Sequence, residues 1–245
     1  MIHRPVVHFS PHPDDELLGA PGALFALRDA GRRIVNVACS LGRPHQELRR
    51  RGELEEACRR AGFELRLEDV EPETVLADLR PGLVVAPNPH DRHPFHEEVA
   101  RAALAAVAAA GAPQTVWLWS LWGETGLPTL AVEVTDERLA EIEHALGAHE
   151  GELARNDSRR LLAARSTASA VLGAERVFGF GAPSLPFPRA ELLTELRLAG
   201  GRWRLCEPRV LRTGAEADDG VAGESDVTDW LLEPSLTTRF GSRHA

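Results

Sequence analysis

Three side chains that can bind metal or move protons lie close together in one short stretch near the N-terminus. His12, Asp14 and Asp15 fall within Ser10-Pro11-His12-Pro13-Asp14-Asp15-Glu16, after a β-branched run and before a long apolar-periodic segment. This order predicts a strand, a tight turn and a helix start, and ligands bind at such strand ends in α/β sheets. Asp and Pro also collect in turns for local reasons, as caps and turn formers. The included imidazole and the position favour a metal site with an adjacent base.

A second group of polar side chains follows the apolar run Leu83-Val84-Val85-Ala86. The loop that comes next contains His90, Asp91, His93 and His96. Both groups then lie at carboxyl ends of strands in the same predicted sheet, so we expect them to face one crevice. Two imidazoles and one carboxylate with an open position are the arrangement of a catalytic zinc site rather than a closed structural one.

The elements that must position these two groups alternate along the first half of the chain. Apolar periodicity and Gly or Pro punctuation predict strands at 6–9, 33–40, 64–70, 83–86 and 115–119. The same signals predict helices at 17–31, about 45–61, 72–79 and about 97–110. This alternation predicts an α/β fold with a Rossmann-like, doubly wound, mostly parallel sheet and helices on both faces.

Beyond Trp122 the pattern becomes irregular. We expect an edge strand at 129–134, helices at 136–147, 157–172 and 189–198, and strands at 176–179 and 205–211. The tail from 214 to 245 is polar with weak periodicity, which predicts partial mobility. Without a repeat or a clear linker, residues 1–245 are predicted to form a single domain with a core at 5–180 and a C-terminal extension at 181–245.

Composition excludes several classes of protein. Of the 245 residues, 43% are apolar and 27% are charged, which is ordinary for a soluble globular chain. The net charge of −9 argues against a nucleic-acid-binding surface or an anionic-membrane partner. Cys39, Cys58 and Cys206 are too few and too scattered for a disulfide framework. With no signal-peptide pattern and no apolar run long enough to span a membrane, we expect a cytoplasmic protein.

The two groups resemble the motifs of a known family. His12-Pro13-Asp14-Asp15-Glu16 matches the HPDDE signature of the LmbE-like, PIG-L group of N-acetylglucosaminyl deacetylases, and His93-Pro94-Phe95-His96 is similar to its HPDH signature. Arg50-x-x-Glu53, followed by Ala57 and Gly62, resembles the family's Arg-x-x-Glu helix after the second strand. The likeness extends over about residues 5 to 180, and the two short motifs carry most of its specificity.

The resemblance implies a role for each matching residue. His12, Asp15 and His96 would bind a divalent metal, zinc above all, with iron(II) or another divalent ion as the alternative. Asp14 would act as general base on a metal-bound water, and His93 would assist as acid or by stabilising the oxyanion. Amide hydrolysis at neutral pH needs the same parts: an activated water, a base and a cation near the developing oxyanion.

Two features depart from the family pattern. Phe95 replaces the acidic residue that usually lies between the two histidines, so another group, with Asp91 as the candidate, must set the pKa and tautomer of His93. The chain also contains no Tyr, which removes any tyrosine-assisted oxyanion step. Neither departure affects the metal ligands, but both weaken the case for His93 as acid.

Candidate substrate-binding residues are Arg43, Arg50, Asp91 and Trp122. A guanidinium can form paired hydrogen bonds with hydroxyl or phosphate oxygens, although the run Leu48-Arg49-Arg50-Arg51 is also typical of a solvated helix face. Trp122 follows the fifth predicted strand beside the crevice, so we expect it to form a wall for an acyl chain or a sugar face. Trp117, within that strand, is expected in the core.

The resulting hypothesis is a zinc-dependent N-deacetylase that acts on a small N-acetylglucosamine-type conjugate. Two alternatives belong to other classes. A non-haem iron(II) oxygenase could use His12, Asp14 and a distant His as a facial triad, although strand–helix alternation does not suit the β-barrel expected for it. A non-catalytic metal- or sugar-binding module could retain the fold and lose turnover through Phe95. The particular conjugate, the native metal and the oligomeric state stay open.

Overall fold

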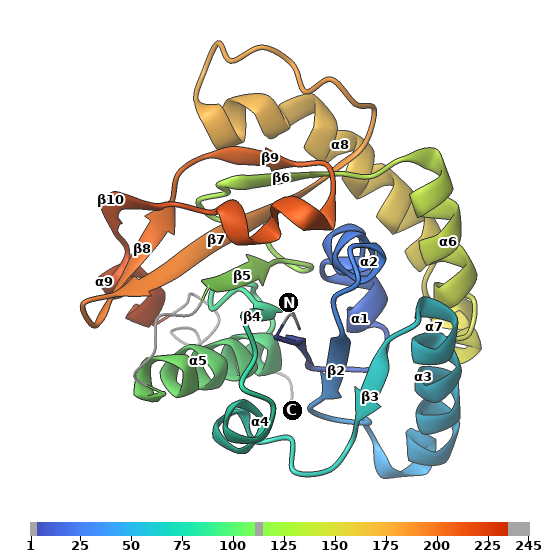
Figure 1. The fold of residues 1–245 in the computed structure, drawn as a ribbon. Coiled ribbons are helices and arrows are strands. Elements are labelled where there is room, and N and C mark those ends of the chain that lie inside the picture. The colour runs from blue at the N-terminus through green and yellow to red at the C-terminus, as the bar shows by residue number, and fades with distance from the viewer. Residues whose placement is uncertain (1–3, 111–114, 235–245) are drawn as a thin grey trace.

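The computed structural model describes residues 4–110 and 115–234, in which one mixed sheet carries helices on both faces (Figure 1). The main strands follow the order β10-β8-β7-β5-β4-β1-β2-β3, and β6 and β9 extend a second layer from β7. The strands are β1 (Val6–Ser10), β2 (Ile34–Ala38), β3 (Glu64–Arg66), β4 (Leu83–Pro87), β5 (Thr115–Trp119), β6 (Leu130–Glu133), β7 (Ala190–Ala199), β8 (Arg202–Cys206), β9 (Arg209–Leu211) and β10 (Ala222–Asp226).

Helices connect these strands. They are α1 (Asp15–Leu18), α2 (Pro21–Asp29), α3 (Glu47–Ala61), α4 (Pro72–Leu79), α5 (Pro94–Ala109), α6 (Asp136–Leu146), α7 (Glu150–Arg155), α8 (Ser158–Phe178), α9 (Thr228–Leu232) and the 3₁₀ turns η1 (Pro44–Gln46) and η2 (Gly214–Asp219). The predicted helix at 17–31 is divided at Gly19, where a Cβ atom would overlap the Trp119 ring. Gly62 ends α3 in the left-handed conformation, as its position in the sequence predicts.

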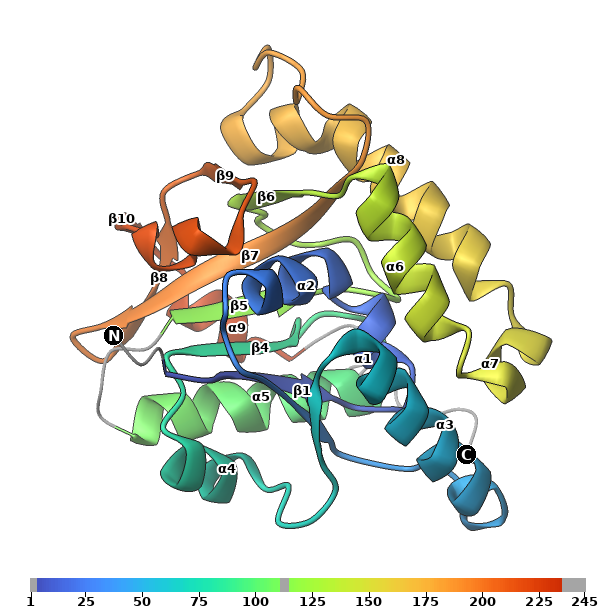
Figure 2. The ribbon, with the colours of Figure 1, turned by 45° about the vertical axis from the view of Figure 1, so that its right-hand side comes forward.

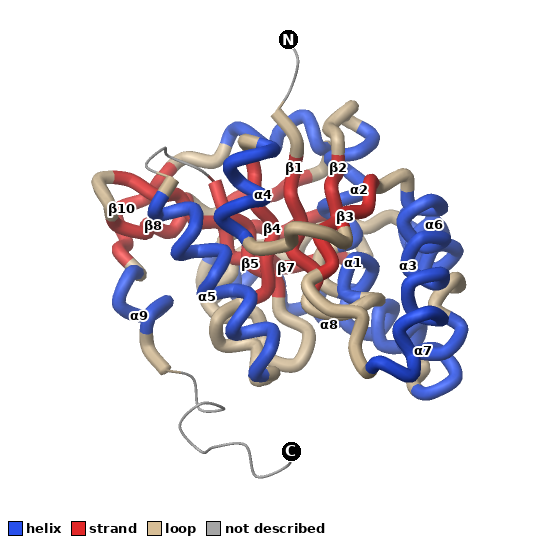
Figure 3. The backbone as a smooth tube through the Cα atoms, turned by 90° about the horizontal axis from the view of Figure 1, so that it is seen from below, coloured by secondary structure: helices blue, strands red, loops and turns tan. Residues whose placement is uncertain are grey.

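The parallel half of the sheet confirms the predicted doubly wound fold. Strand β1 lies between β2 and β4, all three parallel, and β3 and β5 continue the parallel pairing outward. Every residue of β1, β2 and β4 is buried, because helices cover both faces of these strands. Figure 2 shows α4 and α5 on one side of the sheet and α2, α6 and α8 on the other, and Figure 3 shows α4 and α5 in front of the strands from below.

The antiparallel half differs from the sequence-based expectation. Residues 189–198 were predicted as a helix because Leu, Glu, Arg and Ala dominate them, but they form β7. Its C-terminal part pairs with β5 and β8, and its N-terminal part pairs with β6. Pairing with β5 and the alternation of Leu196 and Leu198 into the core outweigh the helix propensity of the segment.

Two further boundaries were predicted wrongly. The predicted strand at 176–179 falls in the last turn and the cap of α8, which continues through Gly173 because that glycine allows close packing on Leu185 and Leu192. The predicted strand at 205–211 is divided at Glu207-Pro208 into β8 and β9, since proline cannot donate to a ladder. Much of the tail is ordered as η2, β10 and α9, and residues 235–245 lie outside the described residues. Among the described helices, none has the length and apolar character that crossing a membrane requires.

A carboxylate from the antiparallel half caps a helix of the parallel half. Glu191 in β7 accepts the backbone N–H groups of Gly22 and Ala23, at 2.6 and 2.9 Å, in the first turn of α2. Burial raises the pKa of Glu191 to about 7, and the two backbone hydrogen bonds oppose this shift only partly. The folded-state pKa therefore lies above 4.5, the ordinary value for glutamate.

This shift predicts a pH dependence of stability. As the pH rises through about 4.5 to 7, the unfolded state loses the Glu191 proton before the folded state does, so Glu191 lowers stability across that interval. Glu191→Gln removes the titration. The free energy of unfolding of Glu191→Gln minus that of wild type, both measured by urea denaturation, should increase as the pH rises from about 4.5 to 7. The increase should reach up to about 1.4 kcal/mol per pH unit.

Exposed Glu124 supplies the matched control. Glu124→Gln makes the same chemical change in a side chain that is 88% exposed, so it measures the effect of the substitution itself. Parallel profiles for wild type and Glu191→Gln would contradict the assigned pKa shift.

Candidate metal centre and active site

Hydrogen bonds within the turn between β1 and α1 fix the first group of polar side chains. The N–H of His12 donates to Asp15 Oδ2 at 2.8 Å, and the N–H of Asp15 donates to the His12 carbonyl at 3.2 Å. Asp14 has a φ of 105°, in the left-handed region that residues with a Cβ rarely adopt. Such a conformation costs about 1–3 kcal/mol. The surrounding structure must therefore hold Asp14 in place.

The start of α5 positions the second group. His93 is the residue before the helix and has an extended backbone, and Pro94 begins the helix with a φ suited to that position. His96 lies in the first turn of α5, buried at 1% exposure. Arg92, which precedes His93, has a positive φ of 64°, and this conformation turns the chain between Asp91 and His93.

Asp91 connects this loop to the loop after β5. Its Oδ2 atom lies 2.8 Å from Nδ1 of His96, and its Oδ1 atom accepts the backbone N–H groups of Leu121, Trp122 and Gly123 at 2.7, 3.1 and 3.1 Å. Asp91 is fully buried, and both of its oxygens are used. It was predicted to bind substrate or to set the state of His93. In the structure its Oδ2 atom contacts Nδ1 of His96, and its charge is also one of those that act on His93.

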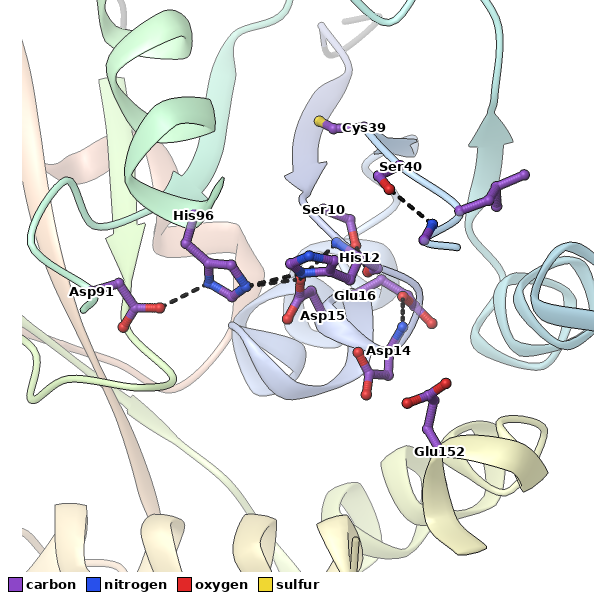
Figure 4. A network of polar contacts seen from close by, with 12 residues as sticks. Ser10, His12, Asp14, Asp15, Glu16, Cys39, Ser40, Asp91, His96 and Glu152 are labelled. Atoms are coloured by element: carbon purple, nitrogen blue, oxygen red, sulfur yellow. Dashed lines mark hydrogen bonds and ion pairs between the residues drawn. The ribbon is translucent and has the colours of Figure 1, made fainter. Parts of the chain in front are cut away.

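Three donor atoms from the two groups form a small triangle (Figure 4). His12 Nδ1 lies 3.2 Å from His96 Nε2, and Asp15 Oδ2 lies 3.4 Å from the former and 3.3 Å from the latter. Tetrahedral ligands at about 2.1 Å from zinc are separated by about 3.4 Å. The residues that the motifs predict as metal ligands therefore have the spacing that a small divalent ion requires.

The charges in this triangle also suit a cation. Burial alone would lower the pKa of His96, but the Asp15 and Asp91 carboxylates outweigh burial and raise it to about 9. Burial alone would raise the pKa of Asp15, but His96 and His12 outweigh it and lower that pKa. The buried carboxylates thus attract positive charge, which a divalent ion supplies in place of a proton.

His93 lies beside the triangle with a different electrostatic environment. The donor atoms of His12, His93 and His96 all lie within 4.8 Å of one another, so His93 is a further possible ligand. Its ring stacks on Trp122 with centroids 5.8 Å apart. Burial, and then the charges of His96 and His12, lower its pKa to about 4. The neutral imidazole of His93 suits the role of hydrogen-bond donor better than the role of general acid.

Asp14 lines the same pocket as His12, Asp15 and His96 without belonging to the triangle. Burial, followed by the charges of Asp15 and Glu16, raises its pKa well above that of a free aspartate. A carboxylate with a raised pKa accepts a proton more readily than an ordinary one, which suits a general base. Asp15 thus contributes an oxygen to the triangle while the adjacent Asp14 lines the pocket, as the motif suggests.

The pocket has a volume of about 870 Å³, and two kinds of side chain line it. We call the apolar side chains the apolar wall and those with guanidinium, amide and hydroxyl groups the polar wall. The apolar wall consists of Leu18, Phe95, Leu121, Trp122 and Leu161. The polar wall includes Ser40, Arg43, Gln46, Arg50, Arg155, Asn156 and Ser158. Trp122 is 56% exposed and belongs to the apolar wall, whereas Trp117 is fully buried, as their positions in the sequence predict.

The two predicted arginines differ in their surroundings. Arg50 is buried, and its Nε donates to Glu152 at 3.0 Å while one terminal nitrogen lies 3.4 Å from the Leu41 carbonyl. Arg43 is exposed at the polar wall. Arg50 is therefore mostly occupied in joining α3 to α7, and Arg43 is the freer of the two to meet a ligand.

Sequence reasoning missed the contribution of the corner between α6 and α7. Glu152 holds Arg50, and buried His149 contacts Glu16 of the first motif. No local pattern marks either residue, because each partner lies about a hundred residues or more away along the chain.

Comparisons with known proteins agree with the motifs. Residues 7–107 match the family model described as PIG-L, GlcNAc-PI de-N-acetylase, and this range contains both groups. A search of curated proteins found no match.

Solved structures share the fold at low sequence identity. The A40926 pseudoaglycone deacetylase is 19% identical with a TM-score of 0.59, over 78% of this chain and 96% of that one. The N,N'-diacetylchitobiose deacetylase from Pyrococcus horikoshii is 21% identical with a TM-score of 0.56, over 78% and 83%. The 4-carboxy-2-hydroxymuconate hydratase from Pseudomonas putida KT2440 is 16% identical with a TM-score of 0.57, over 78% and 95%.

The position of Asp91 predicts an effect on metal affinity. Asp91→Asn places an amide N–H opposite Nδ1 of His96, which favours the tautomer with its proton on Nε2, the atom of the triangle. Loss of such an orienting partner costs about 10- to 100-fold in metal affinity. Competition with a chromophoric zinc chelator measures this change.

The control is Asp157→Asn. Asp157 lines the same pocket, and asparagine can still cap α8 as the aspartate does. Zinc affinity of the control should equal that of wild type, and an unchanged affinity for Asp91→Asn would refute the orienting role.

Proposed function

We propose that the chain is a member of the PIG-L family, whose model matches residues 7–107, and that it is a metal-dependent hydrolase that removes the N-acetyl group from an N-acetylglucosamine-type conjugate. The matched family model is described as a de-N-acetylase, and two of the structures with this fold are deacetylases. The amino-sugar substrate, zinc as native metal and the cytoplasm as location are all parts of this proposal. So is the assignment of residues 1–245 to one domain.

The observation that carries the proposal is the triangle of His12 Nδ1, Asp15 Oδ2 and His96 Nε2, with sides of 3.2 to 3.4 Å. When bound there, a divalent metal supplies Lewis acidity, which lowers the pKa of a water and polarises an amide carbonyl. Imidazole and carboxylate ligands accept zinc, iron(II) or cobalt.

The residues around the triangle have the remaining roles. Asp14 removes the proton from the attacking water, and its raised pKa favours that transfer. His93 donates an N–H to the oxygen on which negative charge develops, which a neutral imidazole can do. The leaving amine then takes the proton held by Asp14, so that acetate and a free amine are the products.

The pocket supports a substrate with one polar and one apolar part. Arg43 and Arg50 on the polar wall can donate to sugar hydroxyls, with Arg43 the better placed. Trp122 of the apolar wall offers a flat apolar surface next to His93. Stacking on an aromatic ring and hydrogen bonds from a guanidinium suit the two faces of a sugar.

The alternatives have less support. The parallel, doubly wound sheet differs from the β-barrel expected for an iron(II) oxygenase, and the matched family is one of deacetylases. Because a hydratase shares the fold, the assay must detect released acetate and amine rather than substrate loss alone. A binding module would hold zinc and release neither product.

The role of Asp14 predicts a loss of turnover without a loss of metal. Asp14→Asn retains the shape of the side chain but cannot accept the proton, so kcat for amine release should fall by about 10²- to 10⁴-fold. Zinc affinity should be unchanged. The assay measures amine and acetate release by zinc-loaded protein from a panel of N-acetylglucosamine conjugates.

Two controls complete this test. Removal of metal by a chelator should abolish release, and added zinc should restore it. Wild type that binds zinc but hydrolyses no conjugate would support the binding module. Phe95→Asp, which introduces the acid typical of the family between the two histidines, would then be the first variant to examine for turnover.

A further inference from the structure

A buried pair joins the first motif to the corner between α6 and α7. Glu16 Oε1 lies 2.5 Å from Nε2 of His149, and both side chains are fully buried. His149 lies outside the residues that match the family model, and the mechanism above does not use it. A carboxylate and an imidazole at this distance inside a protein form a strong, charge-assisted contact. The pair therefore fixes the orientation of the Glu16 carboxylate.

The other oxygen of the same carboxylate supports Asp14. Glu16 Oε2 accepts the backbone N–H of Asp14 at 3.0 Å, as Figure 4 shows. That N–H belongs to the residue whose φ is 105°. A residue with a Cβ keeps such a conformation only when its surroundings oppose relaxation. The Glu16 carboxylate supplies a hydrogen bond that relaxation of this backbone would break.

The corner that carries His149 is itself anchored. The His149 N–H donates to the Leu146 carbonyl at 3.0 Å, and the His149 carbonyl accepts the N–H of Leu153 at 2.9 Å. Next along the chain, the Gly151 N–H donates to Glu53 of α3 at 2.9 Å. His149 thus has a fixed position from which to hold Glu16.

We propose that His149 is a positioning residue for Asp14: it holds the Glu16 carboxylate, which in turn holds the Asp14 backbone so that the Asp14 side chain faces the pocket. This inference rests on the proposed role of Asp14 as general base. The chain of contacts bypasses the three donor atoms of the triangle, because His149 meets Glu16 and Glu16 meets Asp14. Loss of His149 should therefore affect turnover and leave metal binding intact.

The test compares three variants. His149→Leu removes the contact to Glu16, His149→Gln retains an N–H at the position of Nε2, and His144→Leu is a control at an exposed histidine of neighbouring α6. For His149→Leu, kcat should fall by about 10- to 100-fold, as expected for a misplaced catalytic group. KM and zinc affinity should stay at wild-type values. His149→Gln should recover most of kcat, and His144→Leu should match wild type.

A purely structural role would give another result. It would lower the melting temperature of His149→Leu without changing kcat below that temperature, and an unchanged kcat overturns the proposal. Equal losses of kcat and zinc affinity also overturn it, because the contact would then support the triangle instead.

If His149→Leu does not fold, Glu16→Gln takes its place. It is isosteric and lacks the charge that holds His149, so kcat should again fall at unchanged zinc affinity, and wild-type kcat overturns the proposal.

Hydrogen exchange separates this inference from the proposed function. Exchange of the Asp14 amide should be faster in His149→Leu than in wild type or His144→Leu, because the hydrogen bond to Glu16 is loosened. If wild type releases no amine from any conjugate, the proposed function fails, but faster exchange still supports the positioning contact. If wild type is active and exchange is unchanged in His149→Leu, the positioning contact is wrong and the proposed function stands.

Discussion

Parallel pairing of β1 with β4 is the constraint on which the candidate site depends. Val6, Val7 and His8 of β1 pair with Leu83, Val84 and Val85 of β4, although some 77 residues separate them in the sequence. The loops that follow the two strands must then emerge side by side at one edge of the sheet. Each loop delivers part of the donor set, and hydrogen bonds within each loop fix where its imidazole or carboxylate lies. The candidate metal site results from this pairing.

Buried charge then links this edge to the rest of the molecule. Asp91 holds His96 and three amides of the loop after β5, Glu191 caps α2 from β7, and Glu16 meets His149. A buried carboxylate without a partner is costly, so each requires a donor from a distant segment. The irregular second half of the chain therefore does more than form pocket walls, because it also holds the first motif in shape.

The sequence-based predictions were accurate where local interactions determine the structure and wrong where contacts between distant segments do. The alternation of strands and helices in the first half could be predicted, because local periodicity and turn residues determine it. The division of the predicted helix 17–31 at Gly19 was not predicted, because it accompanies a close approach to Trp119. Residues 189–198 were predicted wrongly, because β5 offers them a pairing edge that no local pattern reveals. Asp91 was predicted to bind substrate, and its burial beneath the loop after β5 depends on contacts with that loop, which lies about thirty residues further along the chain.

The sequence by itself determined the doubly wound α/β fold and the residues of the two motifs, because strand–helix alternation and short motif spacing are local properties. The spacing of the three donor atoms, the different environments of His93 and His96, and the support of Asp14 by Glu16 and His149 were decided only by the tertiary structure. Each of these depends on groups that approach one another through strand pairing or helix packing. Their pKa values and orientations arise from burial and neighbouring charges, which exist only after the chain has folded.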